Sequence, residues 1–283
     1  MNEWNRLTEV LLYCPTRPFP DTPLPHEVLH FDAVNVSVLR KQWLAFKTIL
    51  ESLGVHVVVV EEDNESSQWN MLYCRDHFFR TPMGLVMGEM QHPLRKSESP
   101  FVRQALQRAV GPEFLFAVDW GSETIEGADV LWLRDDLVVV GTGHRTTLGA
   151  FNILKSHLKK IGVQVVAWPC SHRQCQHLLG VLQIIDRNLA AVRVDVADPF
   201  IVNGLKEIGY EILPVRETVA VARQQAMNWV CLGPREVLLP EQNGGLNEWL
   251  SRWGVKCHAL PDLSEFLHGG GGLACATGVV ARQ

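Results

Sequence analysis

The feature that most constrains the fold is one type of segment that occurs five times along the chain. Each copy runs from a helix-patterned stretch through a glycine into a short apolar strand. The copies are FKTILESLGVHVVVV, VRQALQRAVGPEFLFAV, LKSHLKKIGVQVVAW, VNGLKEIGYEILPV and LNEWLSRWGVKCHAL. Their glycines, each suited to a left-handed helix C-cap, are Gly54, Gly111, Gly162, Gly209 and Gly254.

A second recurring element, two apolar halves divided by turn residues, predicts a β-hairpin next to each unit. The hairpin segments are EVLLYCPTRPF, HFFRTPMGLVMGEM, DVLWLRDDLVVVGTG, VLQIIDRNLAAVRV and NWVCLGPREVLLPE. A period of roughly 50 residues is typical of propellers and arrays. Ordinary α/β alternation would also give helix–glycine–strand repeats, but five units with hairpins between them favour a fivefold pseudosymmetric α/β propeller. No linker interrupts the pattern, so we expect residues 1–283 to form a single domain.

Composition narrows the class of protein. Hydrophobic residues make up 47% of the chain and charged residues 20%, which is typical of a soluble globular protein. The net charge of −5 and the lack of a long Lys/Arg run disfavour nucleic-acid binding. The most apolar short run, VHVVVV, is too short to span a bilayer, and the N-terminus lacks the pattern of a secretory signal. Seven scattered cysteines do not suggest a disulfide framework, so we expect a reduced, cytoplasmic protein.

Polar residues that do not suit a core stand at the entrance to the first strand of the internal hairpins. They are Asp76, Glu126 with Asp129, His177 and Asn228. The fifth unit is followed instead by four glycines and Cys275. In a closed ring, equivalent strand ends meet near the central axis. We therefore expect Asp76, Glu126, His177 and Cys275 to face one another around one cavity.

The stretch SEFLHGGGGLACATGVVARQ at the end of the chain has two interpretations. It is either a flexible tail with an incidental thiol or a loop that presents Cys275. The glycines Gly269 to Gly272 favour the loop, because a backbone without Cβ atoms can turn tightly and approach a ligand.

Taken together, these segments resemble the arginine deiminase, dimethylarginine dimethylaminohydrolase and amidinotransferase superfamily, the fivefold α/β propellers called penteins. The matching stretches are NMLYCRDHFFRTPMG, EGADVLWL with GHRTTLGAF, QHLLGVLQIID, MNWVCLGP and GGGGLACATG. The resemblance covers essentially the whole chain. It implies that Asp76 and Glu126 grip a guanidinium group, while His177 and Cys275 carry out the chemistry with no cofactor or metal.

The implied chemistry explains these residue types. A guanidinium carbon is a poor electrophile, and a thiolate is the strongest side-chain nucleophile near neutral pH. A bound cation would itself favour the thiolate form of Cys275. Carboxylates at Asp76 and Glu126 would hold the guanidinium through charge-assisted hydrogen bonds. His177 would protonate the departing amine and then activate water, with a covalent S-amidino intermediate between the two steps.

Each of these positions also has a simpler interpretation. Asp76 follows an arginine at a hairpin start and suits a structural cap, and Glu126 could lie on the surface. Asp129 is expected to orient the loop or the histidine more than to touch substrate. Asn70 matches the family pattern ahead of the Arg-Asp acid and contacts either ligand or only the turn.

Two arginines complete the predicted substrate site. Arg145 in GHRTT matches the family arginine that pairs with the substrate α-carboxylate. Arg95 in PLRKSE stands at a family-like distance after Asp76 and suits a second such contact, although a solvated surface arginine is the alternative.

The segment CSHRQCQH invites a zinc interpretation, since it holds Cys170, His172, Cys175 and His177 within eight residues. Structural zinc sites usually pair two close ligands with two from a distant segment. Four ligands so close together do not easily form a tetrahedron, so we disfavour zinc.

One departure from the family pattern concerns substrate choice. Deiminases and many amidinotransferases have His-Leu-Asp or His-x-Asp where this chain has His-Leu-Leu, so Leu179 replaces an acid. Dimethylargininases also lack that acid. An apolar group there leaves room for an N-substituent and withholds one hydrogen bond from an unsubstituted guanidinium, which favours a substituted guanidine as substrate.

The sequence thus predicts a cysteine-dependent hydrolase of the dimethylargininase or deiminase type. An amidinotransferase that passes the amidino group to an acceptor amine is the alternative, and a non-enzymatic pentein scaffold such as a ribosome-associated factor is a further one. The acid, glutamate, histidine and cysteine together argue against the scaffold. The expected partner is a small guanidino molecule, with no nucleic acid and no membrane, and a homodimer is left open.

Overall fold

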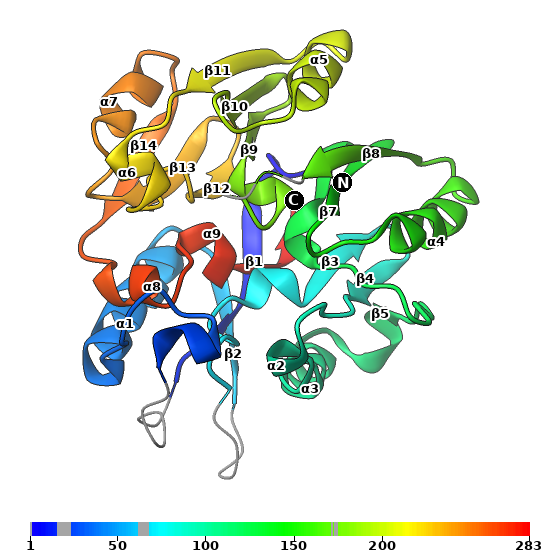
Figure 1. Cartoon of the computed structure of the whole chain (residues 1–283), viewed down its shortest axis with the longest axis horizontal. Coiled ribbons are helices and arrows are strands. Elements are labelled where there is room, and N and C mark those ends of the chain that lie inside the picture. The colour runs from blue at the N-terminus through cyan, green and yellow to red at the C-terminus, as the bar shows by residue number, and fades with distance from the viewer. Residues whose placement is uncertain (1, 16–23, 62–67, 171, 173–174) are drawn as a thin grey trace.

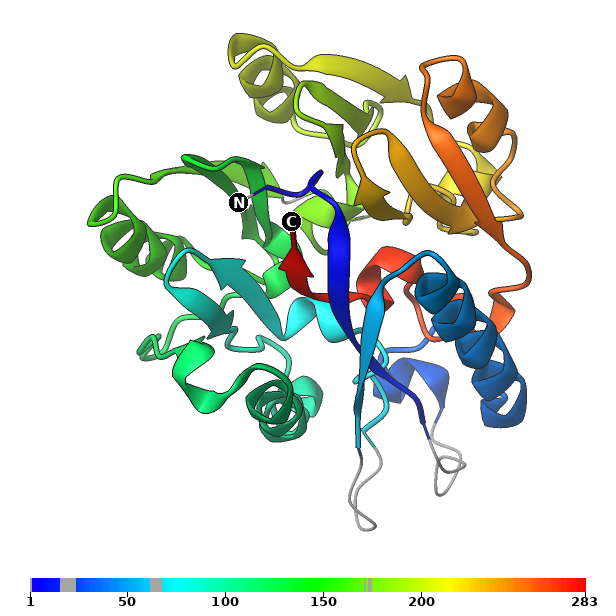
Figure 2. The same cartoon turned by 180° about the vertical axis from the view of Figure 1, so that it is seen from behind.

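Five sheets of three strands each surround a common centre in the computed structural model (Figure 1). The structure describes residues 2–15, 24–61, 68–170, 172 and 175–283. Sheets that follow one another in the chain are neighbours in the ring, and the long helices lie at its periphery (Figures 1 and 2). This arrangement confirms the fivefold α/β propeller that the repeats predict.

Every sheet has the same plan, in which the middle strand pairs antiparallel with one neighbour and parallel with the other. In the order antiparallel, middle and parallel strand, the sheets are β15 (Gly278–Arg282), β1 (Leu7–Tyr13), β2 (His56–Val60); β3 (Phe78–Thr81), β4 (Gly84–Met87), β5 (Leu115–Phe116); β6 (Val130–Arg134), β7 (Leu137–Gly143), β8 (Gln164–Cys170); β9 (Leu182–Asp186), β10 (Leu189–Arg193), β11 (Glu211–Val215); and β12 (Val230–Gly233), β13 (Glu236–Pro240), β14 (Lys256–Leu260). The middle strands are largely buried, which explains their nearly continuous apolar runs.

A helix provides each crossover, because parallel neighbours cannot be joined by a tight turn. These helices are α1 (Val36–Ser52), α3 (Ser99–Val110), α4 (Leu148–Lys159), α5 (Pro199–Glu207) and α7 (Leu246–Ser251). Side-chain oxygens of Asn35, Thr147 and Asp198 accept hydrogen bonds from backbone N–H groups in the first turns of α1, α4 and α5.

The five repeat glycines all have positive φ, between 70° and 89°, as expected of residues that end the helices. Gly111 differs in ψ, which is 146° and therefore extended. The residues after it form a 3-10 turn, η3 (Pro112–Phe114), so that only two residues are left for β5.

Four of the five predicted hairpins are confirmed, and the first is wrong. The strand β1 in EVLLYCPTRPF pairs antiparallel with β15 at the other end of the chain, with Val10 opposite Val279. The second half of that segment, from residue 16, lies outside the described residues. Figure 2 shows β1 and β15 side by side near the centre. The chain end therefore closes the ring, which also excludes a flexible tail.

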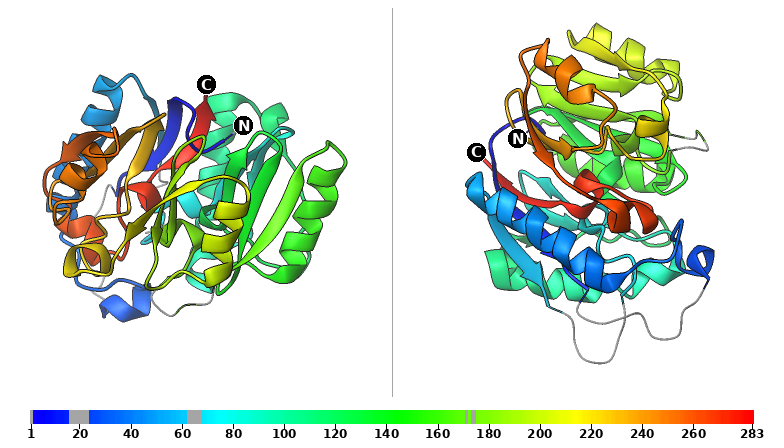
Figure 3. Two further views of the ribbon diagram at one scale, coloured as in Figure 1. Left: turned by 90° about the horizontal axis from the view of Figure 1, so that it is seen from above. Right: turned by 90° about the vertical axis from the view of Figure 1, so that its left-hand side faces the viewer.

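The remaining helices are short. They are α2 (Pro93–Lys96), α6 (Val219–Ala222), α8 (Ser264–His268) and α9 (Leu273–Ala276), with the 3-10 turns η1 (Pro25–Val28), η2 (Cys74–Asp76), η4 (Gly127–Asp129) and η5 (Leu178–Gly180). Within the described ranges, apolar clusters join each sheet to its neighbours. Both chain ends lie on one face of the ring (Figures 2 and 3). In the part of the chain that the structure describes, no helix is long and apolar enough to cross a membrane.

Candidate active site

The polar residues singled out in the sequence occupy one repeated position. The turns η2, η4 and η5 stand immediately before β3, β6 and β9, the first strands of their sheets, and α9 stands before β15. Asp76 lies in η2, Glu126 and His177 are the residues before η4 and η5, and Cys275 lies in α9. Asn228 holds the equivalent place before β12. Ring closure brings these five turns toward the axis.

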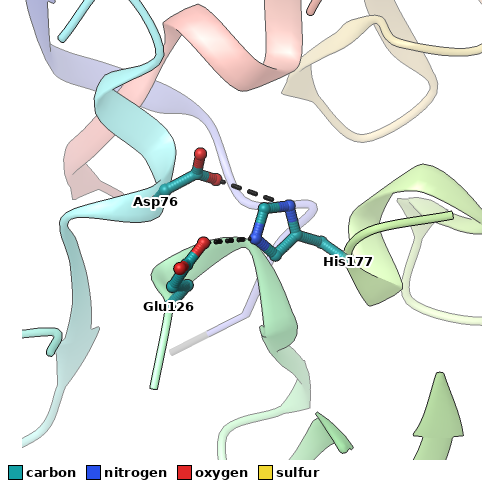
Figure 4. Close-up of side chains that lie close together, drawn as sticks. All are labelled: Asp76, Glu126 and His177. Atoms are coloured by element: carbon teal, nitrogen blue, oxygen red, sulfur yellow. Dashed lines mark hydrogen bonds and ion pairs between the residues drawn. The ribbon is translucent and has the colours of Figure 1, made fainter. Parts of the chain in front are cut away.

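Asp76, Glu126 and His177 converge on one another from three different sheets (Figure 4). The imidazole Nε2 lies 2.6 Å from Glu126 Oε2, and Nδ1 lies 3.7 Å from Asp76 Oδ1. Glu126 is fully buried and Asp76 is 4% exposed, which excludes a surface role for either side chain. The expected meeting of the three groups is therefore confirmed.

The charges of this cluster stabilise one another. Although burial opposes the charged form, the nearby Asp76 carboxylate and the hydrogen bond to Glu126 raise the pKa of His177 to about 9. Burial likewise opposes the charged form of Glu126, but the hydrogen bond and the positive charge of His177 lower the pKa of this carboxyl group to about 2. At neutral pH the imidazole is therefore protonated and paired with a carboxylate, so it holds a proton that it can give to a leaving group.

Cys275 lies beside this cluster, because α9 packs against η2. Burial, and next the negative charge of Asp76, raise the pKa of the Cys275 thiol. Three features act in the opposite direction: a hydrogen bond with the backbone at Gly272, one from Asn228 Nδ2, which lies 3.0 Å from Sγ, and the positive charge of Arg95. The resting sulfur is therefore a neutral thiol that already has hydrogen-bond donors for its anion.

Asn228 holds Cys275 from two sides. Besides its bond to sulfur, its Oδ1 accepts a hydrogen bond from the Cys275 backbone N–H at 3.1 Å. In the sequence, Asn228 is visible only as a polar residue at a strand entrance, which indicates no role for it. The signal was its repeat position, which matches those of Asp76, His177 and Cys275.

The glycine run approaches protein groups rather than open space for a ligand. A Cβ on Gly271 would lie 2.4 Å from the Tyr73 ring, and one on Gly272 would lie 2.8 Å from the Asn228 side chain. Only Gly270 in this run has positive φ, at 97°. The glycines therefore allow close packing around the cysteine turn. Gly270 is also favoured for its backbone conformation, because its φ is positive.

Asp129 is hydrogen-bonded to η5, the turn that follows His177. Its Oδ2 accepts a hydrogen bond from Thr146 Oγ1 at 2.7 Å, and its Oδ1 accepts one from the Leu178 backbone N–H at 2.8 Å. Burial raises its pKa to about 6, against the effects of His177 and these two hydrogen bonds. Both oxygens thus contact the protein, one of them at the turn that follows His177.

The structure places Arg95 in the interior, so its interpretation as a solvated surface arginine is wrong. Its guanidinium pairs with Asp76 Oδ2 and with Glu98 Oε2, the latter at 3.1 Å, and its Nη2 donates to the backbone oxygens of Asn70 and Tyr73. The guanidinium of Arg95 thus interacts with protein side chains and backbone oxygens. Nothing in the sequence around Glu98, which reads as an exposed helix start, indicated this buried ion pair.

Two atoms in the site are buried without a hydrogen-bond partner among the described residues: Asp76 Oδ1 and Arg145 Nη1. Arg145 donates through Nη2 to Gln176, and its Nη1 is 3.9 Å from Glu126 Oε1. A buried acceptor and a buried donor without partners are the arrangement expected of a site that awaits a polar ligand.

The side chains of Asn70 and Leu179 both contact protein groups. The Asn70 side chain donates to the Val28 backbone oxygen at 2.9 Å, so it contacts protein and not open space. Leu179 is 8% exposed and belongs to an apolar cluster that includes Ala274, the neighbour of Cys275.

The structure does not bring the four residues of CSHRQCQH together as a ligand set. Within the described ranges, the one group of side chains with atoms close enough to hold a metal ion is Asp76, Glu126 and His177. Cys170 and Cys175 are buried and His172 is exposed. The zinc interpretation therefore lacks the geometry that it requires.

In sequence, the chain resembles arginine deiminases. A family model described as arginine deiminase matches residues 64–208, about half of the chain. The arginine deiminase of Mycoplasma capricolum is 28% identical over 253 residues, 76% of this chain and 62% of that protein. The arginine deiminase of Mycobacterium avium is 28% identical over 188 residues, 56% of this chain and 46% of that protein. The match thus spans 62% or less of the length of these two relatives.

In fold, the chain resembles three solved proteins over nearly their whole lengths. The N-terminal domain of the cyanobacterial arginine dihydrolase ArgZ has a TM-score of 0.79, with 17% identity, 97% of this chain and 98% of that one covered. An amidinotransferase of saxitoxin biosynthesis from Microseira wollei has 0.78, with 18% identity and coverages of 100% and 96%. Dimethylarginine dimethylaminohydrolase from Pseudomonas aeruginosa has 0.75, with 15% identity and coverages of 96% and 98%. At these identities the likeness establishes the fold.

Proposed function

The chain belongs to the arginine deiminase family, and from this premise we propose that residues 1–283 form one catalytic domain that hydrolyses a guanidine at its central carbon. The observation that carries the proposal is the buried Asp76 Oδ1, which accepts no hydrogen bond from the described residues and lies 3.7 Å from the His177 imidazole, in the group next to Cys275. An open carboxylate oxygen beside a thiol and an imidazolium suits a planar cation with several N–H donors.

The first half-reaction forms a bond between sulfur and carbon. The Cys275 thiol is neutral in the resting protein, and a guanidinium bound at Asp76 favours its loss of a proton to solvent. The thiolate then attacks the guanidinium carbon. As the C–N bond breaks, the departing nitrogen takes the proton that His177 holds, which leaves an S-amidino group on Cys275 and a neutral imidazole.

The second half-reaction releases the product. The neutral His177 takes a proton from water, and the resulting hydroxide attacks the amidino carbon. The C–S bond then breaks to return the thiolate, and the new hydroxyl group loses its proton to solvent to become the ureido carbonyl. Glu126 keeps the imidazole oriented throughout, since its Oε2 lies 2.6 Å from Nε2. Asp129 acts as a positioning residue for the same turn through its bond to Leu178. Arg145, whose Nη1 has no hydrogen-bond acceptor among the described residues, is the residue that we expect to meet a substrate carboxylate.

Product analysis tests this function against transfer. The protein is incubated with arginine, N-methylated arginines and simpler guanidines, with and without an acceptor amine. Ammonia, alkylamine, ureido product and amidino transfer are recorded separately. Ureido product without an acceptor supports the hydrolase. Amine-dependent transfer without ureido product would replace it by the amidinotransferase, and no turnover of any guanidine would contradict both.

We further propose that the substrate carries an N-substituent, because Leu179 supplies no carboxylate where deiminases have one. A hydrogen bond to a charged group contributes about 1.5–3 kcal/mol, so unsubstituted arginine should bind roughly tenfold to a hundredfold more weakly without it. Each buried CH₂ of a substituent adds about 0.8 kcal/mol. We expect Leu179→Asp to shift kcat/KM toward arginine, whereas the uncharged Leu179→Asn, of similar size, should not.

The parent protein provides the decisive comparison for this substrate. A kcat/KM higher for N-methylarginines than for arginine supports the proposal. A strong preference for unsubstituted arginine would show that Leu179 does not face the guanidinium, and the hydrolytic chemistry at Cys275 would be unaffected by that result.

Asn228 is expected to lower the pKa of Cys275 through its hydrogen bond to sulfur. Asn228→Ala should reduce both kcat/KM and the rate of iodoacetamide alkylation at pH 8 by roughly tenfold to a hundredfold, since it removes one hydrogen bond to an anion. Asn228→Asp should reduce both further, because a carboxylate beside sulfur disfavours the thiolate.

The pH dependence of alkylation separates this effect from simple damage. In the Asn228 variants the rate should rise at a higher pH than in the parent and reach a similar plateau. Asn188→Ala, an exposed asparagine in the β9–β10 turn, serves as the control. An unchanged alkylation pKa in Asn228→Ala would mean that the residue only packs against the cysteine turn.

A further inference from the structure

Two small cavities lie directly behind the catalytic turns. One has a volume of about 30 Å³ and the other about 20 Å³, and both are lined by Glu3, Arg75, Val279 and Arg282. They adjoin, because they share these four residues. The larger one also touches Ala274, the residue before Cys275. Their shared lining includes Glu3 of the N-terminal segment and Val279 and Arg282 of β15. Figure 2 shows that these two segments lie near each other close to the centre of the ring.

Three residues that line these cavities carry buried N–H groups without acceptors among the described residues. Arg75 donates through Nη2 to Glu3 at 3.2 Å, but its Nε is buried and has no partner among the described residues. Arg282 donates through Nη1 to the backbone oxygens of Asn5 and Cys231, and its Nε is likewise buried and unpartnered. The indole N–H of the fully buried Trp229, which lines the larger cavity, is a third such group.

Among the residues that line the two cavities, positively charged side chains outnumber negatively charged ones. Arg75, Arg80 and Arg282 line the smaller cavity against the single carboxylate of Glu3. Burial lowers the pKa of Arg282, and Arg75 adds to the effect while Glu3 opposes it. This local excess contrasts with the net charge of −5 of the whole chain. Arg75 is buried and paired with Glu3, whereas Arg80 and Arg282 are half-buried and have no carboxylate partner among the described residues. A cation partly removed from water without a counter-charge is costly.

Glu3 does not cover the unpartnered donors. Its Oε2 faces Arg75 Nη2, and its Oε1 accepts the Trp132 backbone N–H at 3.4 Å. Cavities of this size hold one or two water-sized atoms, since about 10–15 Å³ is enough for one water. A water molecule would satisfy an N–H group but would leave the excess charge uncompensated.

We propose that these adjoining cavities form a structural binding site for a small monoatomic anion such as chloride, held by Arg75, Arg282 and Trp229 behind the catalytic turns. The anion neutralises part of the charge at the axis and ties the end of β15 to the turn that carries Asp76. This site is independent of the reaction at Cys275.

Crystals of the full chain grown in sodium bromide test the site directly. An anomalous bromide peak within hydrogen-bond distance of Arg75 Nε or Arg282 Nε is the expected result. Density there without anomalous signal at saturating bromide would show that water fills the cavities and would overturn the proposal.

Thermal unfolding provides a second test in solution, with bromide or chloride exchanged for gluconate at constant ionic strength. Above half-saturation, Tm of the parent should rise by about 3 °C for each tenfold increase in halide. Arg282→Met should lose this dependence, whereas Arg187→Met, which removes an exposed arginine in the β9–β10 turn, should keep it. An equal dependence in the parent and Arg282→Met would contradict the site, and the parent crystals decide if Arg282→Met does not fold.

Discussion

Replacing Cys275 by serine is expected to lower kcat by about a thousandfold or more while the protein stays folded. A serine hydroxyl at this position has no comparable route to its anion, and the Cys74 thiol in the equivalent turn η2 is fully buried, which raises its pKa. The fold should persist because the sulfur makes a hydrogen bond to Asn228 that an oxygen can also accept. Steady-state turnover and thermal unfolding measure the two effects.

The covalent step has its own readout. Mass spectrometry of a quenched reaction should find an amidino adduct on Cys275 and on none of the other six cysteines. Cys14 and Cys257 are the relevant internal controls, since they are also partly exposed. Turnover of Cys275→Ser within tenfold of the parent, or an adduct on a different cysteine, would remove Cys275 from the mechanism.

Replacing His177 by alanine or glycine should slow both half-reactions by about a hundredfold to ten-thousandfold, because one imidazole serves as acid and then as base. Rapid-quench measurements should show slower formation of the adduct and slower decay. A variant that forms the adduct at the parent rate would assign the acid role to another group.

The pH profile gives an independent check on His177. Its pKa is raised to about 9, so the imidazole keeps its proton across the range in which an ordinary histidine loses it. The acid needed for the first step is therefore present up to about pH 9 and is lost above it. We expect kcat/KM of the parent not to fall between pH 7 and 8, and to lose its acid only in the alkaline range. His177→Ala should lack that alkaline fall, and normal rates in this variant at every pH would refute the acid/base role.

Much of the fold could be predicted from the sequence because its information is local. Helix periodicity, a glycine at each helix end and turn residues between apolar halves act over a few residues. The predicted hairpin in EVLLYCPTRPF failed for the opposite reason. The partner of β1 is β15, which lies at the far end of the chain, and no short-range signal encodes that pairing.

The candidate site also combines residues that the sequence indicates with contacts that only the folded structure shows. The repeat position selected Asp76, Glu126 with Asp129, His177 and Asn228, and the glycine run after the fifth unit selected Cys275. The pairing of Arg95 with Glu98 was not predictable. The sequence around Glu98 is typical of an exposed helix start, whereas the side chain is 1% exposed in the fold. Asn228 was visible as a position, but its contacts with Cys275 required the structure.

By itself, the sequence determined the repeating unit, its order along the chain and the turns that carry the reactive groups. The tertiary structure decided which of those groups touch, how their charges shift one another and what lies behind them at the axis. The physical reason is distance along the chain. Turn and helix preferences depend on neighbouring residues, whereas the His177–Glu126 pair, the bond from Asn228 to Cys275 and the arginines around Glu3 exist only after the ring has closed.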